Sequence, residues 1–188
     1  MSRNNSKKTI LLLSDDIRHN SGIAVASRLI VLGTIHKYNF INIGGSLKSP
    51  DSGKVFDLSD ACKEINGKDD NYLKLYPVDG YGNEEILFQI ISQEKPDVIL
   101  HFTDPRYWGW LYNIENQIRA KVPLTYYTIW DATPCPSWNK PFYKSCDALF
   151  SISKQTECLV KHTLGPENCT SIYGDFDKNG KIIQKEIV

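Results

Sequence analysis

PDVILHFTDPRYWGWLYNIENQIRAKVPLTYYTIWDATP, residues 96–134, is the stretch that decides the fold. The apolar run at residues 98–102 follows a proline and is typical of a buried parallel strand. Residues 107–118 then carry Tyr, Leu and Ile side chains at helical spacing, which predicts a helix with one buried face. A second β-rich run covers residues 124–130. The stretch therefore predicts a strand, a helix and a neighbouring parallel strand.

Polar residues follow both predicted strands. Asp104 and Arg106 lie in the turn after the first strand, and Asp131 follows the second. Because parallel strands bring their carboxyl ends to one edge of a sheet, we expect these three side chains to line that edge. Ligands of open α/β folds bind at the same edge.

The rest of the chain repeats this alternation, with the least regular part at residues 46–71. Further strands are expected at 9–14, 40–43, 73–78, 148–152 and 169–173, and helices at 23–32, 84–94, 139–146 and 154–164, with a hairpin and a short helix near 59–65. The pattern predicts an α/β fold with a single Rossmann-like, doubly wound, mostly parallel sheet. We expect a polar tail at residues 1–8, one domain at 9–174, and a polar tail or linker at 175–188.

Several local expectations accompany this assignment. The helix at residues 23–32 is apolar on most faces, which predicts burial on all sides. Gly33 is expected to end that helix. Gly44 and Gly45 are expected to close the strand before them, and Asp177 to Gly180 to form a turn. Asn83 and Ser153 are expected to cap the helices at 84–94 and 154–164.

Composition excludes several classes of protein. The 188 residues contain 22 Lys plus Arg and 22 Asp plus Glu, so the net charge is zero and general nucleic-acid binding is not expected. No apolar run approaches ~20 residues, so no membrane span is expected. The short apolar run after the N-terminus does not resemble a secretory signal, and we expect a cytoplasmic protein. Five cysteines without a CxxC pair predict no metal site.

The first predicted strand is followed by a loop that ends in Asn20, Ser21 and Gly22. A glycine at a helix N-terminus allows a phosphate to approach free backbone N–H groups. The chain has neither GxGxxG nor GxxxxGK[ST], so neither the dinucleotide fingerprint nor the P-loop is present. The alternative is an ordinary strand-to-helix turn.

Asp15 and Asp16, together with Lys154 after a late strand, suggest a second alternative, a phospho-acceptor receiver domain. That arrangement needs an aspartate closing the middle strand. Asp104 comes several residues too late for this position.

Asp104 and Asp131 are the candidate catalytic residues, since either carboxylate can accept a proton or hydrogen bond from a hydroxyl. The alternative for Asp104 is turn formation before Pro105, and for Asp131 a helix or turn cap. His101 lies inside a predicted buried strand, where a histidine is more often a core residue than a catalyst.

Aromatic residues crowd this third of the chain, among them Trp108 and Trp130. Aromatic rings at the mouth of a cleft suit a sugar or a base, because both stack on ring faces. The alternative is a cluster in the core.

The runs HFTDPRYWGWLYNIENQIR and PLTYYTIWDATPCPSWNKPFYKSCDALFSISKQT, with the HNSGIA loop, resemble the N-terminal domain of GT-B glycosyltransferases of the group 1, family 4-like type. The versions most similar in appearance come from bacteriophages and bacteria. The resemblance implies one of two Rossmann-like domains around a cleft, the one that mainly holds the sugar acceptor. The nucleotide-sugar is then a co-substrate held by a C-terminal domain that is not in this sequence, and no cofactor is expected.

By this resemblance, Gly22 would lie near the donor phosphates, Asp131 would face the cleft, and Asp104 and Arg106 would line the acceptor side. A separate donor-domain chain or self-association would complete the cleft, and an apolar or aromatic strip should be exposed at the sheet edge. A non-catalytic module that binds a glycan or a protein is the alternative function.

Overall fold

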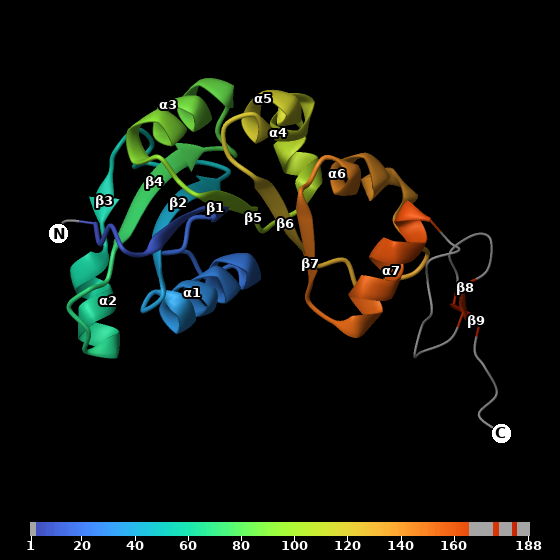
Figure 1. Ribbon diagram of the computed structural model, residues 1–188, viewed down its shortest axis with the longest axis horizontal. Helices are drawn as coiled ribbons and strands as arrows, with labels where there is room; N and C mark the ends of the chain where they lie inside the picture. Colours follow the sequence, from blue (N-terminus) through green and yellow to red (C-terminus); the bar gives the residue numbers. More distant parts are fainter. Residues whose placement is uncertain (1–2, 166–174, 177–181, 184–188) are drawn as a thin grey trace.

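The computed structural model describes residues 3–165, 175–176 and 182–183, and shows an α/β protein in three layers (Figure 1). The central sheet has seven strands in the order β3-β4-β2-β1-β5-β6-β7. Neighbouring strands are parallel except for β3 and β4. The strands are β1 Lys8–Asp15, β2 Tyr38–Ser46, β3 Phe56–Asp57, β4 Leu73–Asp79, β5 Val98–His101, β6 Leu124–Thr128 and β7 Ala148–Ser151. The predicted fold class, α/β with a mostly parallel sheet, is confirmed.

Helices cover both faces of the sheet. They are α1 Gly22–Thr34, α2 Ser59–Asn66, α3 Glu84–Glu94, α4 Gly109–Asn113, α5 Glu115–Arg119, α6 Lys140–Lys144 and α7 Lys154–Leu164, with short 3₁₀ helices η1 Pro105–Trp108 and η2 Ser137–Asn139. Helices α3, α4 and α5 lie on one side of the sheet and α1 and α2 on the other (Figure 1). Helices α6 and α7 pack together beside β7.

The strand order decides against the receiver alternative. Without the short β3, the order β4-β2-β1-β5-β6-β7 is the Rossmann order, in which the first strand lies between the second and the fourth major strand. A receiver-like sheet places its second strand at the edge and the third next to the first. The strand order therefore rules out the receiver alternative. The strand order reverses between β1 and β5, where α/β folds of this order bind their ligands.

Strand β1 is the centre of the core. Leu11, Leu12 and Leu13 are all fully buried, because consecutive strand residues point to opposite faces and helices cover both. Leu11 and Leu13 pack in the cluster under α3, α4 and α5, whereas Leu12 packs in the cluster under α1 and α2.

The helix expected at residues 107–118 is instead three short segments, η1, α4 and α5. The chain turns into η1 at Asp104, and a 3₁₀ helix has about three residues per turn rather than 3.6. This shifts the buried face by one residue, so Trp108 is fully buried and Tyr107 is 59% exposed. The predicted buried position of Tyr107 is wrong for that reason.

Helix α1 also differs from the prediction of burial on all sides. Ala24, Ser27 and Val31 form its buried stripe, while Leu29 is 67% exposed, because one face packs on the sheet and no other described element covers the opposite face. The helix continues through Gly33 to Thr34. Strand β2 likewise continues through Gly44 and Gly45 to Ser46.

Other local predictions are confirmed. Asn83 caps α3 by accepting a hydrogen bond from Ile86 N, and Ser153 caps α7 in the same way. The short helix expected near 59–65 is α2, and the irregular part before it contributes β3. Within the described residues no helix is long and apolar enough to cross a bilayer.

The end of the chain is described only in part. The strand expected at residues 169–173 and the turn expected at 177–180 lie outside the described residues. The described pairs Asp175–Phe176 and Ile182–Ile183 form a two-stranded antiparallel sheet, β8 with β9, which the sequence analysis did not predict.

Candidate ligand-binding site

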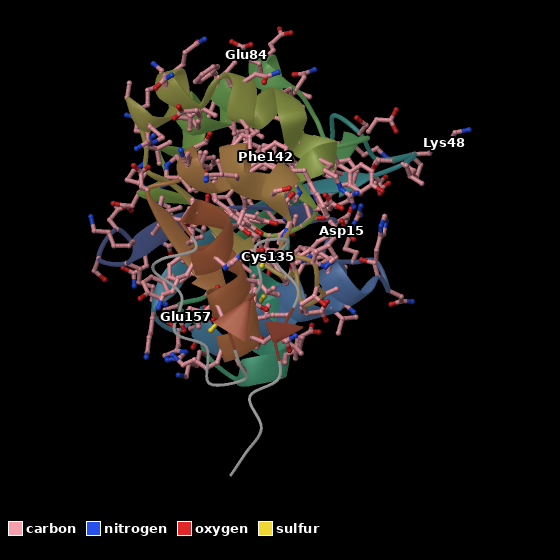
Figure 2. All side chains as sticks on the ribbon, turned by 90° about the vertical axis from the view of Figure 1, so that its right-hand side faces the viewer. Asp15, Lys48, Glu84, Cys135, Phe142 and Glu157 are labelled. Carbon is pink, nitrogen blue, oxygen red and sulfur yellow. The ribbon has the colours of Figure 1, made fainter. Side chains whose placement is uncertain are left out.

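A cavity of about 290 Å³ opens where β5 and β6 end. The two strands are parallel neighbours, with His101 beside Tyr126, so the loops that follow them meet at one edge. Figure 2 shows this side of the molecule at the right, where the labelled Asp15 ends β1 and Lys48 follows β2. The cavity is lined by Asp104, Pro105, Arg106, Tyr126, Ile129, Trp130, Asp131, Ala132 and Asn139. Three of the predicted polar residues, Asp104, Arg106 and Asp131, therefore line one cavity.

Asp104 and Arg106 form a closed pair on one wall. Arg106 Nε donates to both carboxylate oxygens of Asp104, at 2.9 and 3.0 Å, and the backbone N–H of Arg106 donates to Oδ1 at 2.9 Å. Burial raises the pKa of Asp104, but the hydrogen bonds and charge of Arg106 outweigh burial and hold the pKa below its ordinary value. The pair is electrically neutral. Asp104 also caps η1, so the turn-forming alternative and a place in the cavity both hold for this residue.

Asp131 also lines the cavity and is exposed. Its backbone oxygen accepts a hydrogen bond from Gln155 Nε2 at 3.2 Å, which attaches the loop to α7. Its carboxylate makes no hydrogen bond and no ion pair to any residue that the structure describes. The side chain therefore caps no described helix or turn, and the carboxylate is free to accept hydrogen bonds from a ligand.

Trp130 contributes an aromatic side chain to the lining of the cavity. Its Nε1 donates to Ala132 O at 2.6 Å, and its ring meets Trp138 edge-on, with centroids 5.4 Å apart. Both contacts fix the orientation of the indole. Trp138 is 47% exposed, so an aromatic ring is accessible to solvent at this part of the structure.

Asn139 also lines the cavity and was not predicted as a site residue. It is 3% exposed, and its Nδ2 donates to Tyr143 Oη at 3.4 Å. Its Oδ1 is buried and has no hydrogen-bond partner among the described residues. A buried acceptor without a donor is unfavourable, so a bound hydroxyl group near the cavity floor has a suitable partner.

Trp108 cannot form part of this cavity. It is fully buried under α4, with its ring 5.3 Å from that of His101 and 5.8 Å from that of Trp110. The expectation that Trp108 contacts a ligand is corrected, because the 3₁₀ turn directs this ring into the core. His101 is also fully buried, and burial lowers its pKa to about 3, as expected for a core residue that stays neutral.

The loop after β1 holds Asn20, Ser21 and Gly22 at the exposed start of α1. Ser21 caps α1 by accepting from Ala24 N at 3.0 Å, and its hydroxyl donates to the carboxylate of Asp15. Nothing lies within 4 Å of a Cβ built at Gly22, so the space above it is open. The Asp15 carboxylate, however, already lies beside this positive helix end and disfavours a second anion.

Arg18 in the same loop already forms ion pairs and is not available to a ligand phosphate. Its guanidinium pairs with Asp16 at 2.7 Å and with Asp51 at 3.0 Å. Hydrogen bonding to Asp16 raises the pKa of Arg18. The loop thus combines a glycine at a helix start, as the sequence predicts, with a carboxylate-rich surface that suits hydroxyl groups better than phosphate.

Tyr81 is a second residue that the sequence analysis did not single out. It lies between Gly80 and Gly82, whose φ angles are +62° and +72°. Its ring packs against Gly45, where a Cβ would come within 2.6 Å of Tyr81 Cδ1. In the sequence, only the two adjacent glycines at 44–45 and the Gly-Tyr-Gly turn at 80–82 could have indicated the contact between Tyr81 and Gly45.

Comparison with protein-family models, with curated proteins and with solved structures finds no match. Within the described residues no group of three or more His, Cys, Asp or Glu side chains is arranged to hold a metal ion.

Proposed function

We propose that this chain is the acceptor-binding, N-terminal domain of a GT-B glycosyltransferase, which works with a donor-binding half to transfer a sugar from a nucleotide-sugar to an acceptor hydroxyl. The observation that carries the proposal is a cavity at the carboxyl edge of a Rossmann-order sheet, lined by Trp130 and by Asp131, whose carboxylate has no partner within the described residues. An aromatic face stacks on a sugar ring, and a carboxylate accepts hydrogen bonds from its hydroxyl groups.

The chemistry follows from the positions of these groups. An acceptor hydroxyl that donates to Asp131 keeps its oxygen lone pairs free to attack an anomeric carbon presented from the other side of the cleft. Asp131 then takes the hydroxyl proton, while the nucleoside diphosphate leaves with the electron pair of the broken bond. Asp104, neutralised by Arg106, is a hydrogen-bond acceptor that orients the sugar rather than a base.

Saturation-transfer NMR with methyl glycosides of glucose, galactose, mannose and N-acetylglucosamine tests acceptor binding. We expect at least one glycoside to bind, and Trp130→Ala to abolish its signal, while Trp130→Phe retains it because an aromatic face remains. If none of the four binds, the proposal fails. The thermal midpoint of each variant shows whether the fold is intact.

Calorimetry with a panel of nucleotide-sugars tests the role of the donor half. We expect no measurable affinity for the isolated chain, because the Asp15 carboxylate lies beside the start of α1 and Arg18 is paired with Asp16 and Asp51. Micromolar binding would contradict the need for a separate donor half.

The non-catalytic glycan-binding module is the second candidate function. The exposed Trp138 and Tyr107 favour it, since exposed aromatic rings at a sheet edge are typical of a binding surface. Supplying a donor half, such as one encoded next to this chain, separates the two functions: transfer of sugar to the bound glycoside supports the enzyme, and binding without transfer supports the module.

A further inference from the structure

A second aromatic surface lies along the same sheet edge, outside the cavity. The rings of Tyr81 and Tyr107 are stacked, with centroids 5.1 Å apart and planes 11° from parallel. Tyr81 comes from the loop after β4, and Tyr107 from η1 after β5. One face of Tyr107 rests on Tyr81, while the residue as a whole is 59% exposed. An aromatic face is therefore presented to solvent in a fixed orientation.

The core holds this pair in place. Gly45, at the end of β2, leaves room for the Tyr81 ring, which no residue with a Cβ would allow without a shift. The other side of Tyr81 meets the buried Trp108 ring at 5.6 Å, and Trp108 in turn contacts His101. A stacked aromatic pair that depends on buried rings and on a glycine is pre-organised for binding rather than a mobile surface residue.

The charges near the pair favour an uncharged ligand. Arg106 is paired with Asp104, and Arg18 with Asp16 and Asp51, so neither guanidinium is free for a phosphate or a carboxylate. Asp15 and Asp104 both lie close enough to raise the pKa of Tyr81, in addition to the larger effect of burial. Hydroxyl groups of a stacked sugar would find acceptors in these carboxylates, and the charge of Asp15 would disfavour an anion.

The two aromatic surfaces are separated along the edge. Tyr81 lies over the end of β2 and Trp130 follows β6, with β1 and β5 between them. Three strand spacings of ~4.8 Å put Tyr81 about 14 Å from Trp130. The exposed Tyr107 ring lies one ring stack, 5.1 Å, from Tyr81, so the two surfaces are a distance apart that is on the order of two linked sugar rings.

We propose that the carboxyl edge binds an uncharged oligosaccharide across two subsites, one in the cavity beside Trp130 and one on the exposed face of Tyr107. This inference rests on the proposed function, since it extends the acceptor site from one sugar ring to several. In this arrangement Trp130 binds the sugar nearest Asp131. Tyr107 binds a more distant sugar of the same chain, so it makes affinity depend on the length of the acceptor.

Calorimetry with the purified chain tests this, using cello-, malto- and chito-oligosaccharides of one to four units. In at least one series the affinity should rise about five-fold or more from one unit to three, the gain expected from one added aromatic stack. Tyr107→Ala should remove that rise and leave affinity for the single sugar unchanged. Tyr107→Phe should keep the rise, because the ring remains.

Tyr38→Ala is the matched control, because Tyr38 is 37% exposed and begins β2 at the other end of the strand. Affinities that do not depend on length, or a rise that survives in Tyr107→Ala, would overturn the second subsite while leaving the proposed function intact. Binding of no sugar of any length would remove both. Tighter binding of the 6-phosphate of the same single sugar would overturn the preference for an uncharged ligand.

Discussion

His101 Nδ1 and Tyr112 Oη lie 2.7 Å apart in the core, directly behind the cavity wall formed by Tyr126. The imidazole stacks on Tyr126 at 5.0 Å, and its Nε2 has no partner among the described residues. A protonated imidazole would place a charge in this apolar surrounding, which explains why burial lowers the pKa of His101 to about 3.

This pair makes stability depend on pH. In the unfolded chain His101 binds a proton below about pH 6.5, whereas in the folded chain it stays neutral, so the unfolded state binds more protons. The free energy of unfolding should therefore fall as the pH falls below about 6.5, by up to about 1.4 kcal/mol per pH unit from this group. Urea unfolding at pH 7.5 and pH 5.5 measures the change.

The variant His101→Asn isolates the contribution of His101 to the pH dependence of stability. The asparagine amide can still form a hydrogen bond with Tyr112, and it does not titrate in this range. The variant should lose part of the pH dependence whatever its absolute stability, and the surface variant His36→Asn should not. Equal pH dependence in the parent chain and in His101→Asn would show that His101 is not responsible.

Glu94 is the centre of a buried polar network at the end of α3. Its carboxylate accepts from Lys74 Nζ at 2.7 Å and from the hydroxyls of Tyr72 and Tyr76. Burial raises the pKa of Glu94, but these hydrogen bonds outweigh burial and lower the pKa, so its stabilising effect is present above the unfolded pKa and is lost as the pH falls through the folded pKa. Glu94→Gln should cost about 2–4 kcal/mol of unfolding free energy at pH 7, since Lys74 loses its partner.

Urea unfolding measures this loss, with Glu64→Gln as the control, because Glu64 is exposed on α2 and its replacement should change stability by less than about 0.5 kcal/mol. A change of similar size in both variants would mean that the network contributes nothing beyond general charge effects.

Substitution by alanine should have opposite effects on stability at Gly45 and at Gly33. Gly45→Ala places a Cβ 2.9 Å from Gly80 O as well as against the Tyr81 ring, so it should destabilise the fold by about 1–3 kcal/mol and displace Tyr81. Gly33→Ala, in open space within α1, should stabilise by about 0.5–1 kcal/mol. Thermal unfolding measures whether each variant is less or more stable than the parent chain. Near-ultraviolet circular dichroism reports whether the environment of the tyrosine rings has changed. A neutral Gly45→Ala would show that β2 and the Tyr81 loop separate easily.

The sequence predicted the elements that depend on local pattern. Apolar runs bounded by proline or polar residues identified the parallel strands, and Asn83 and Ser153 identified helix starts, because both signals act within a few residues. It failed where a contact distant in sequence decides, as at Gly44 and Gly45, where the strand continues because both residues pair with β1 and β4. It also failed at Tyr107 and Trp108, since a one-residue change of helical phase exchanged the buried and the exposed ring.

The candidate site also contains residues that local sequence patterns predict and residues that they do not. Asp104, Arg106 and Asp131 could be placed together because neighbouring parallel strands bring their ends to one edge. Asn139 could not, because it reaches the cavity through η2, and nothing local marks that approach.

Asp131→Asn is the sharpest test of the site. The carboxylate makes no hydrogen bond or ion pair within the described part of the chain, so the variant should unfold within about 0.5 kcal/mol of the parent chain. A glycoside hydroxyl that donates to the charged group should bind about ten-fold more weakly to the neutral amide, and transfer with a donor half should fall further because the amide cannot take a proton. Calorimetry and thermal unfolding measure the two effects, and Asp60→Asn, on the exposed surface of α2, should change neither binding nor transfer. If instead Asp131→Asn lowers the thermal midpoint and leaves glycoside binding unchanged, the residue is a loop-stabilising acid, and the acceptor site has to be sought around Asp104.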